Sequence, residues 1–268
     1  MNPRFSLAIV AVLLGLGSAF LLLQPPTAHI PRATAPAEPA ETPAPERRTR
    51  PAESDAFFIL AVSWQPAFCE SAPGKPECRS QSRDRFDASH FTLHGLWPED
   101  QYCDVSARDE ATDRDGRWSA LPAPDLSAAL RRDLETAMPG TLSQLDRHEW
   151  IKHGTCFPGD AEAYFAASLA LLDQLNASPV RELFAANIGK RLTQRQIRAA
   201  FDTGFGAGTG DSVRIACDDD GDRTLVTELT LGLWGIIDTA PDLATLLEAA
   251  NPTRGGCEAG IIDPVGLQ

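Results

Sequence analysis

The chain has 268 residues, of which 43% are hydrophobic, and its 37 acidic residues outnumber 24 Lys and Arg residues to give a formal net charge of −13. This net charge falls within residues 57–268, because the acidic and basic residues of 1–56 balance one another. A protein that holds nucleic acid tightly needs a basic surface, so the composition argues against a high-affinity nucleic-acid-binding module. It does not exclude an enzyme that touches a few phosphates briefly.

The chain begins with an expected export signal. Residues 1–4 carry one positive charge, and residues 5–23 are apolar or small and uncharged. That pattern is typical of a signal peptide, and its length is also close to the minimum for a membrane span. A cleaved signal and an uncleaved membrane anchor therefore both stay open for residues 1–23. Residues 24–56 are rich in Pro, Ala, Thr and Glu without apolar periodicity, which predicts a disordered linker.

Residues 57–268 are the predicted folded domain, since about 210 residues are enough to bury one core. All six cysteines lie there, which fits three disulfides in an exported protein, although spacing alone does not choose among the pairings. Apolar patterning and turn signals predict strands at 57–64 and 91–97, helices at 125–137, 141–154, 160–176, 179–188 and 193–202, strands at 213–217 and 224–234, and a short helix at 241–250. This order predicts an α+β fold with a central antiparallel β-sheet packed by several α-helices.

Three local patterns support these elements. Thr193 and Gln196 form a capping box at the start of a helix. The dipeptide Asp220-Gly221 predicts a hairpin turn, which suits the surrounding acidic run better than a calcium loop does. The glycine-rich run 204–210 lacks the Gly-Lys-Ser/Thr ending of a phosphate-binding loop, so a flexible connection is expected there.

Two short segments carry most of the functional information, and the first is FTLHGLWP at residues 91–98. On a regular strand, His94 would point to one face, and Gly95 and Trp97 to the other. Gly95 leaves room for the close approach of a ligand or another element. Trp97 offers an aromatic plane at the end of the strand. The nearby His90 is expected to be a structural histidine.

The second segment follows about fifty residues later and reads HEWIKHGTC. It is predicted to lie on a helix with Thr141 as the N-cap. Residues four apart on a helix are neighbours, so His148 would lie above Lys152, and Glu149 above His153. The four polar side chains would then form one compact patch.

Three histidines, a carboxylate and an ammonium group would thus meet at one site. Histidine can take or give a proton near neutral pH, and a lysine can stabilise negative charge that develops during a reaction. Cleavage of a phosphodiester without a metal requires this set of groups. A zinc site is disfavoured, because His148 and His153 are five residues apart whereas zinc-binding histidines on one helical face are four apart. Neither a metal nor another cofactor is expected.

FTLHGLWP and HEWIKHGTC resemble the two active-site segments of the ribonuclease T2 family, and residues 63–69 (SWQPAFC) resemble its first strand and first cysteine. The similarity covers about residues 57–263 and is strongest to the bacterial periplasmic branch, the broad-specificity ribonuclease I type. It implies an endoribonuclease that cleaves single-stranded RNA with low base specificity, through 2′,3′-cyclic phosphates to 3′-phosphate ends. DNA lacks the attacking 2′-hydroxyl and is not expected as a substrate. The alternative is a catalytically silent, envelope-anchored RNA-binding or interaction protein of the same fold, which the intact catalytic set disfavours.

The resemblance also implies a role for each site residue. His153 would act as the general base on the 2′-hydroxyl and His94 as the general acid on the leaving oxygen, although the residues alone leave open which is base and which is acid. Glu149 and Lys152 would stabilise the pentacoordinate phosphorus, His148 would hold the phosphate, and Trp97 would stack on a base.

The family pattern implies the disulfides Cys69–Cys78, Cys103–Cys156 and Cys217–Cys257. The second would hold the two active-site segments together. With the export signal, the resemblance implies a periplasmic or secreted monomer, tethered to the membrane if residues 5–23 are retained.

The chain departs from the family at positions that contact bases. It reads Trp64-Gln65-Pro66 where many members read Gln-Trp-Pro, Glu99 where a fungal type has aspartate, and Leu145 where an aromatic residue is frequent. Base preference is therefore open. The remaining tryptophans are expected to pack in or near the core; they are Trp64, Trp118, Trp150 and Trp234.

Overall fold

The computed structural model describes residues 56–267. The expected export segment and linker lie outside the described residues, apart from Ala56, which begins the first strand. Within residues 56–267, no helix combines the length and the hydropathy needed to cross a bilayer.

The main predicted elements are present with shifted ends. The strands are β1 (Ala56–Ser63), β2 (Thr92–Pro98), β3 (Arg191–Thr193), β4 (Val213–Asp220), β5 (Arg223–Gly235) and β6 (Ala259–Ile261). The α-helices are α1 (Gln65–Ser71), α2 (Pro76–Arg79), α3 (Ala107–Arg114), α4 (Ala128–Ala137), α5 (Leu145–Lys152), α6 (Ala161–Asn176), α7 (Pro179–Ala186), α8 (Gln194–Phe205) and α9 (Leu243–Ala249). Short 3-10 helices are η1 (Phe86–Ala88), η2 (Trp118–Ala120), η3 (Pro139–Ser143), η4 (Gly154–Cys156) and η5 (Thr209–Ser212).

The strands form one sheet in the order β2-β1-β5-β6-β3, with β4 also paired to β5. The long ladders that join β1 to β2, β1 to β5 and β4 to β5 are antiparallel, as predicted. The β5–β6 pair is parallel, through Leu225 and Ile261, so the sheet is mixed rather than wholly antiparallel. The α+β fold class is confirmed.

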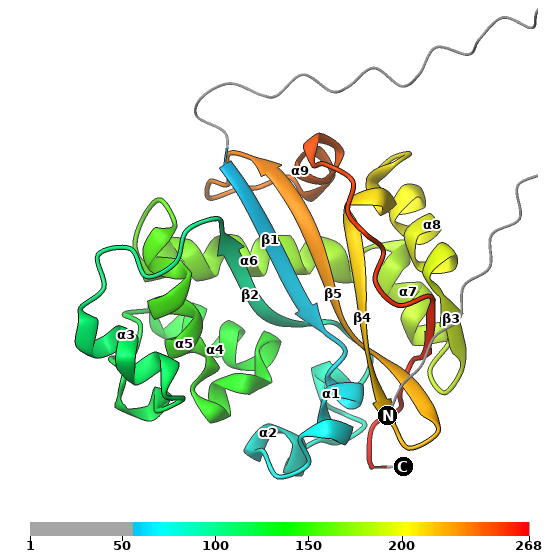
Figure 1. The fold of residues 1–268 in the computed structure, drawn as a ribbon, viewed down its shortest axis with the longest axis horizontal. Helices are drawn as coiled ribbons and strands as arrows, with labels where there is room; N and C mark the ends of the chain where they lie inside the picture. The colour runs from blue at the N-terminus through cyan, green and yellow to red at the C-terminus, as the bar shows by residue number, and fades with distance from the viewer. Residues whose placement is uncertain (1–55, 268) are drawn as a thin grey trace, which may run out of the picture. The chain divides into compact units, whose positions relative to one another are not determined.

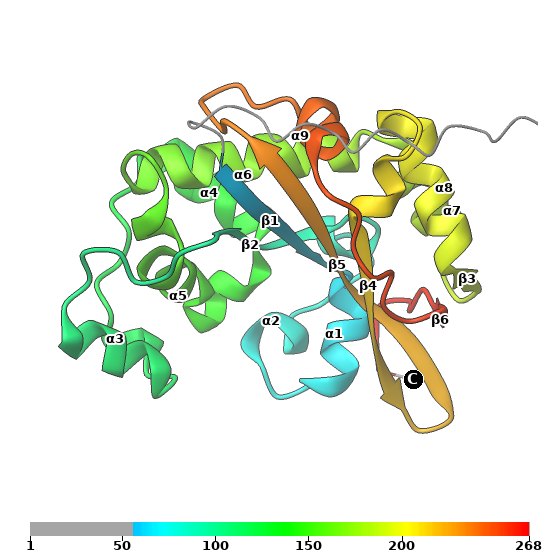
Figure 2. The same cartoon turned by 45° about the horizontal axis from the view of Figure 1, so that its top comes forward.

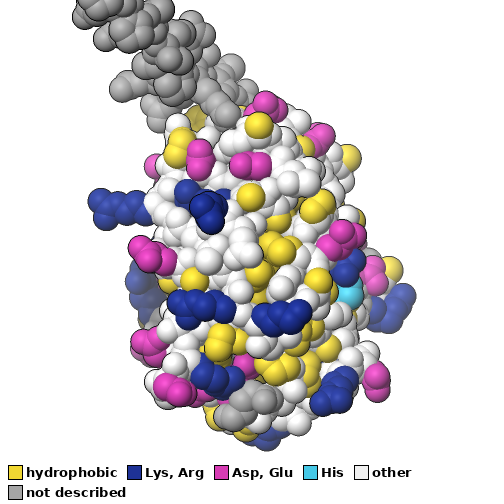
Figure 3. Space-filling view, turned by 90° about the vertical axis from the view of Figure 1, so that its right-hand side faces the viewer, with side chains coloured by type: hydrophobic (Ala, Val, Ile, Leu, Met, Phe, Trp, Pro, Cys, Tyr) yellow, Lys and Arg dark blue, Asp and Glu magenta, His cyan; other side chains and the backbone are white. Residues whose placement is uncertain are grey.

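The helices cover the sheet and build the core with it. Figure 1 shows α6 passing behind β1 and β2, with α7 and α8 beyond β4, and Figure 2 shows α3 and α5 grouped on the side of β2. Leu171, Leu172 and Leu175 of α6 are fully buried. Each buried leucine stabilises the fold by about 1.5–3 kcal/mol relative to an exposed one. The side of the molecule that carries α7 and α8 mixes Lys and Arg with Asp and Glu (Figure 3), so this face has no continuous basic surface.

The local patterns have mixed outcomes. The capping box of Thr193 is present at the start of α8. The hairpin turn between β4 and β5 consists of Gly221 and Asp222, one residue later than predicted, with Gly221 at a φ of 62°. The expected flexible run is held in place instead, because Asp202 Oδ1 accepts hydrogen bonds from the backbone N–H groups of Gly208 and Gly210.

Three disulfides cross-link the described chain. They are Cys69–Cys78, Cys103–Cys156 and Cys217–Cys257, the pairings that the family resemblance implied. The second connects the loop after β2 to the end of η4, the short helix that follows α5.

Candidate active site

A β-bulge at His94 turns three site residues to one face of β2. Ala61 and Ser63 of β1 are two residues apart and face the same side, but their partners on β2 are three residues apart. His94 is the extra residue in this bulge. His94, Gly95 and Trp97 consequently share a face, and the rings of His94 and Trp97 lie 5.2 Å apart. The prediction that His94 points away from Gly95 and Trp97 is wrong, because strict alternation does not hold across a bulge.

Glu149 of α5 lies at the centre of this face, with only 1% of its side chain exposed. Its Oε2 accepts a hydrogen bond from the indole Nε1 of Trp97 at 2.8 Å. Its Oε1 lies 3.7 Å from His94 Nε2 and 3.8 Å from His148 Nε2. The carboxylate fits against β2 because Gly95 has no side chain, and a Cβ there would lie 2.7 Å from Glu149 Cδ. The predicted space at Gly95 is therefore filled by this carboxylate.

The helix that carries Glu149 begins later than predicted. The residues before it form η3, and Gln144 adopts a left-handed conformation with a φ of 61° between η3 and α5. Thr141 is therefore not the N-cap, and no side chain caps α5. His153 lies at the C-cap, where its backbone N–H donates to the carbonyl of Glu149 at 3.0 Å.

His153 is buried against Trp97, with its side chain stacked on the indole at a centroid distance of 5.4 Å. Among the described residues, its Nδ1 has no hydrogen-bond partner. Burial, followed by the positive charges of Lys152, His148 and His94, lowers the pKa of His153 to about 3. The imidazole is neutral at ordinary pH and able to accept a proton.

His94 lies between two carboxylates. Its Nδ1 is 2.6 Å from Glu228 Oε2, and its Nε2 faces Glu149. Burial lowers the pKa of His94, but the hydrogen bond to Glu228 and the charge of Glu149 outweigh it, so the pKa lies above its usual value. Burial raises the pKa of Glu149, partly offset by the charges of His94 and His148. The protonated form of His94 is favoured, which is the opposite of His153.

His148 is held by Asp113 of α3. Its Nδ1 lies 2.7 Å from Asp113 Oδ1, and the other carboxylate oxygen accepts from the Tyr102 hydroxyl at 2.9 Å. The Trp118 ring stacks on the imidazole at 4.5 Å, and its Nε1 donates to the Asp113 carbonyl at 3.3 Å. These contacts fix the ring and leave Nε2 facing Glu149.

The predicted site residues therefore come together, but not in the predicted pairs. Among residues 56–267, the Glu149 carboxylate forms its ion pairs with His94 and His148 rather than with His153. Lys152 lies beside them on α5, and its backbone carbonyl accepts from Tyr102 N at 2.8 Å. A cavity of about 350 Å³ opens next to this set. Its wall includes His94, Glu228, Trp118, Gln65 and Leu145.

The model of the Ribonuclease T2 family matches residues 55–242, more than half of the chain. The chain belongs to the ribonuclease T2 family. It is an RNA-cleaving enzyme. It is 31% identical over 235 residues to Ribonuclease I of Escherichia coli (strain K12), covering 78% of this chain and 86% of the relative. It is 30% identical over 131 residues to Ribonuclease 3 of Arabidopsis thaliana, covering 45% and 53%. Among solved structures, it is similar to RNase NT in complex with 5′-AMP, with a TM-score of 0.47, 23% identity and coverage of 78% and 98%.

Three residues at the site of this ribonuclease were missed by sequence reasoning. Glu228 and Asp113 lie 134 and 35 residues from the histidines that they bind. Glu228 is the one charged residue in the predicted strand 224–234, which is a signal that could have identified it. Trp118 was expected to pack in or near the core, but it is half-buried and lines the cavity.

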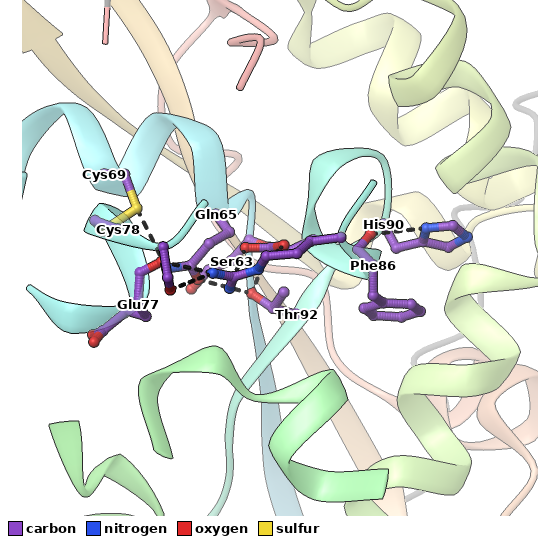
Figure 4. Close-up of polar contacts among 11 residues, drawn as sticks. Ser63, Gln65, Cys69, Glu77, Cys78, Phe86, His90 and Thr92 are labelled. Atoms are coloured by element: carbon purple, nitrogen blue, oxygen red, sulfur yellow. Dashed lines mark hydrogen bonds and ion pairs between the residues drawn. A yellow bond between two sulfur atoms is a disulfide. The ribbon is translucent and has the colours of Figure 1, made fainter. Parts of the chain in front are cut away.

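The expectation for His90 holds, and both His90 and Gln65 contact other protein groups (Figure 4). His90 is structural: its Nδ1 lies 3.0 Å from the Phe86 carbonyl, and its ring stacks on Phe86. The Gln65 amide is engaged within the protein, because its Oε1 accepts from the Thr92 hydroxyl at 3.3 Å and its Nε2 contacts Cys69 Sγ at 3.6 Å. Within residues 56–267, no group of three or more His, Cys, Asp or Glu side chains could hold a metal ion.

Proposed function

We propose that this ribonuclease cleaves single-stranded RNA by metal-independent acid–base transphosphorylation, with His153 as the general base and His94 as the general acid. The observation that carries the proposal is the contrast in surroundings: His94 lies between the carboxylates of Glu228 and Glu149, whereas His153 is buried with no hydrogen-bond partner at Nδ1 among the described residues. The two pKa values move in opposite directions as a result. Transphosphorylation needs one neutral imidazole and one protonated imidazole at the same pH. Burial makes His153 the neutral one, and two carboxylates make His94 the cation.

In the first step, His153 takes the proton of the 2′-hydroxyl, and O2′ attacks the phosphorus. His94 Nε2 gives its proton to the departing 5′-oxygen, which leaves a 2′,3′-cyclic phosphate. In the second step, water opens the ring to a 3′-phosphate, with the two histidines exchanging roles. DNA is not a substrate in this scheme, because it has no 2′-hydroxyl.

The other site residues bind the scissile phosphate or stabilise the phosphorane-like transition state. Lys152 supplies a positive charge, and His148 holds a phosphate oxygen through the Nε2 that Asp113 leaves available. Glu149 places the two imidazoles that flank its Oε1, a buried oxygen with no hydrogen-bond partner among the described residues. Unpaired buried polar atoms are rare, and a catalytic role is one explanation for them.

Low base specificity is supported by the cavity beside His94. The Gln65 amide is engaged by Thr92 and Cys69, and Leu145 offers an apolar but not an aromatic surface. Trp97 can stack on any base, because every base has a π-face. Neither Gln65 nor Leu145 therefore supports hydrogen-bonded readout of one particular base.

We also propose that the enzyme is an exported monomer, periplasmic or secreted, with residues 5–23 as its signal or anchor. Three disulfides support an oxidising compartment, since such bonds are rare in reducing ones. The net charge of −13 supports brief contact with RNA rather than tight storage of it.

The test is cleavage of a short single-stranded RNA by the full, oxidised chain in EDTA at about pH 6, with mass analysis of the products. We expect 2′,3′-cyclic phosphates first and 3′-phosphates later, no cleavage of the matching DNA, and loss of activity in His153→Ala. Inhibition by EDTA would contradict the metal-independent mechanism. An inactive, correctly oxidised chain would instead support the silent RNA-binding alternative.

A further inference from the structure

Glu228 is a carboxylate on β5, a strand whose other residues are mostly apolar and buried. Its side chain is 22% exposed, while Val226, Leu229 and Leu231 on the same strand are fully buried. A carboxylate that leaves water is unfavourable unless a partner compensates it. Among the described residues, the ion-pair partner of Glu228 is His94, at 2.6 Å.

We propose that Glu228 is a positioning residue for the RNA-cleaving reaction, and that it holds the Nδ1–H of His94 so that Nε2 faces the scissile phosphate. The inference rests on the proposed function, in particular on His94 acting as the acid. The geometry supports it, because Glu228 binds one ring nitrogen of His94 and leaves the other toward Glu149 and the site.

The proton balance of the reaction shows why this hold matters. In the first step the O2′–P bond forms and the P–O5′ bond breaks. His153 takes the proton of the 2′-hydroxyl, and His94 gives its Nε2 proton to O5′, while its Nδ1–H stays hydrogen-bonded to Glu228. The ring is then neutral, with a lone pair at Nε2. In the second step the water oxygen bonds to phosphorus and the P–O2′ bond breaks, while Nε2 takes a proton from the water and His153 returns its proton to O2′. A free neutral imidazole can carry its proton on either nitrogen. The tautomer that is protonated at Nε2 cannot accept a proton from water at that atom.

Glu228 makes the closest contact to His94 among several charged groups. Glu149 lies farther away, at 3.7 Å, and it faces Nε2. Lys152 of α5 acts in the opposite sense, because its charge lowers the pKa of His94. The cavity wall beside His94 and Glu228 also carries Asp218 of β4 and Lys75 and Glu77 of the α1–α2 segment. Replacing Glu228 by glutamine therefore removes one charge while the other charged groups stay in place.

The experiment compares Glu228→Gln with the native full chain on two substrates. One is a ribodinucleotide, whose departing 5′-oxygen needs a proton. The other is a nucleoside 3′-(4-nitrophenyl phosphate), whose leaving group departs as a stable anion. We expect kcat/KM to fall about 10- to 100-fold on the dinucleotide and less than about 3-fold on the nitrophenyl ester, because the acid matters for the first substrate only.

The matched control is Glu248→Gln, which removes the same charge from an exposed position on α9. It should leave both substrates unaffected. Equal losses of Glu228→Gln on the two substrates would show a general structural defect, and no loss would show that Glu228 is dispensable. Either result overturns the proposal.

An NMR titration of His94 separates this proposal from the proposed function. We expect the pKa of His94 to be lower in Glu228→Gln than in the native chain, whatever the activity. If the native chain cleaves RNA and the His94 titration is unchanged in the variant, the positioning role is wrong. If the native chain cleaves neither substrate but the pKa of His94 differs between the native chain and Glu228→Gln, the proposed function is wrong and the contact between Glu228 and His94 is supported.

Discussion

Replacing Gly95 by alanine tests whether the close fit of Glu149 against β2 builds the site. The new Cβ would lie 2.5 Å from Trp97 Nε1 and 2.7 Å from Glu149 Cδ, where ordinary contact begins at 3.4 Å. The carboxylate must therefore retreat by about 1 Å, which strains or breaks the Trp97–Glu149 hydrogen bond. Overpacking and the loss of a charge-assisted hydrogen bond together destabilise the fold by about 2–4 kcal/mol. A displacement of this size at reacting groups lowers the rate about 100-fold.

Urea unfolding and kcat/KM on a ribodinucleotide measure the two effects. Gly232→Ala is the matched control on β5, because its Cβ would meet nothing closer than Ser212 O at 3.4 Å. It should leave activity unchanged and alter stability by less than about 1 kcal/mol. In the Gly95→Ala background, Glu149→Asp shortens the crowding side chain and should restore about 1 kcal/mol of stability relative to Gly95→Ala alone. Native stability and activity in Gly95→Ala, or no coupling between the two substitutions, would refute the reasoning.

Three further expectations concern the rest of the site. Asp113→Asn weakens the contact that orients the ring of His148. In steady-state kinetics, we expect KM for RNA to rise about 10-fold and kcat to stay nearly unchanged. An unchanged KM would contradict phosphate binding by His148. The general base must be neutral to act, and the pKa of His153 is about 3. We therefore expect kcat/KM, measured from about pH 3 to about pH 9, to stay high at pH values well below the usual pKa of histidine. A fall in kcat/KM on the acid side at about pH 6 would contradict the assignment of His153 as the base. Removing the Cys103–Cys156 disulfide with a double Cys→Ala substitution should lower the free energy of unfolding by about 4 kcal/mol. Removing the Cys69–Cys78 disulfide, which closes a shorter loop between α1 and α2, should lower it by about 2.5 kcal/mol. Equal losses would show that loop length does not set the stabilisation by these disulfides.

Hydrophobic patterning predicted the elements with a clear apolar face. The helix expected at 160–176 is Ala161–Asn176 in the structure, with Asp160 as its N-cap. The same reasoning missed α3, whose sequence ARDEATDR has no apolar face to detect. It also missed the three-residue strands β3 and β6, which are formed by pairing with each other and, for β6, with β5.

The proximity of the candidate site residues was predictable, but their contacts were not. The two motifs place the histidines, Glu149 and Lys152 near one another, and the structure brings them together. Their partners come from distant segments, and side-chain pairing over 134 residues leaves no periodic signal. The break before α5 was also not predicted, because Gln144 adopts a left-handed conformation that is uncommon for glutamine.

Irregular pairing in the sheet brings His94 and Glu228 together. β2 has one extra residue, His94, relative to β1, and β5 has one extra residue, Thr227, relative to β4, immediately before Glu228. β2 and β5 flank β1 and are not neighbours, so regular strand spacing puts their backbones about 10 Å apart. The side chains nevertheless approach to 2.6 Å, across the end of β1 where the small residue Ser63 pairs with Glu228. Bulges bend and twist a strand locally, so the contact between His94 and Glu228 depends on the positions of the two bulges. The alternation of residues along a strand does not predict those positions.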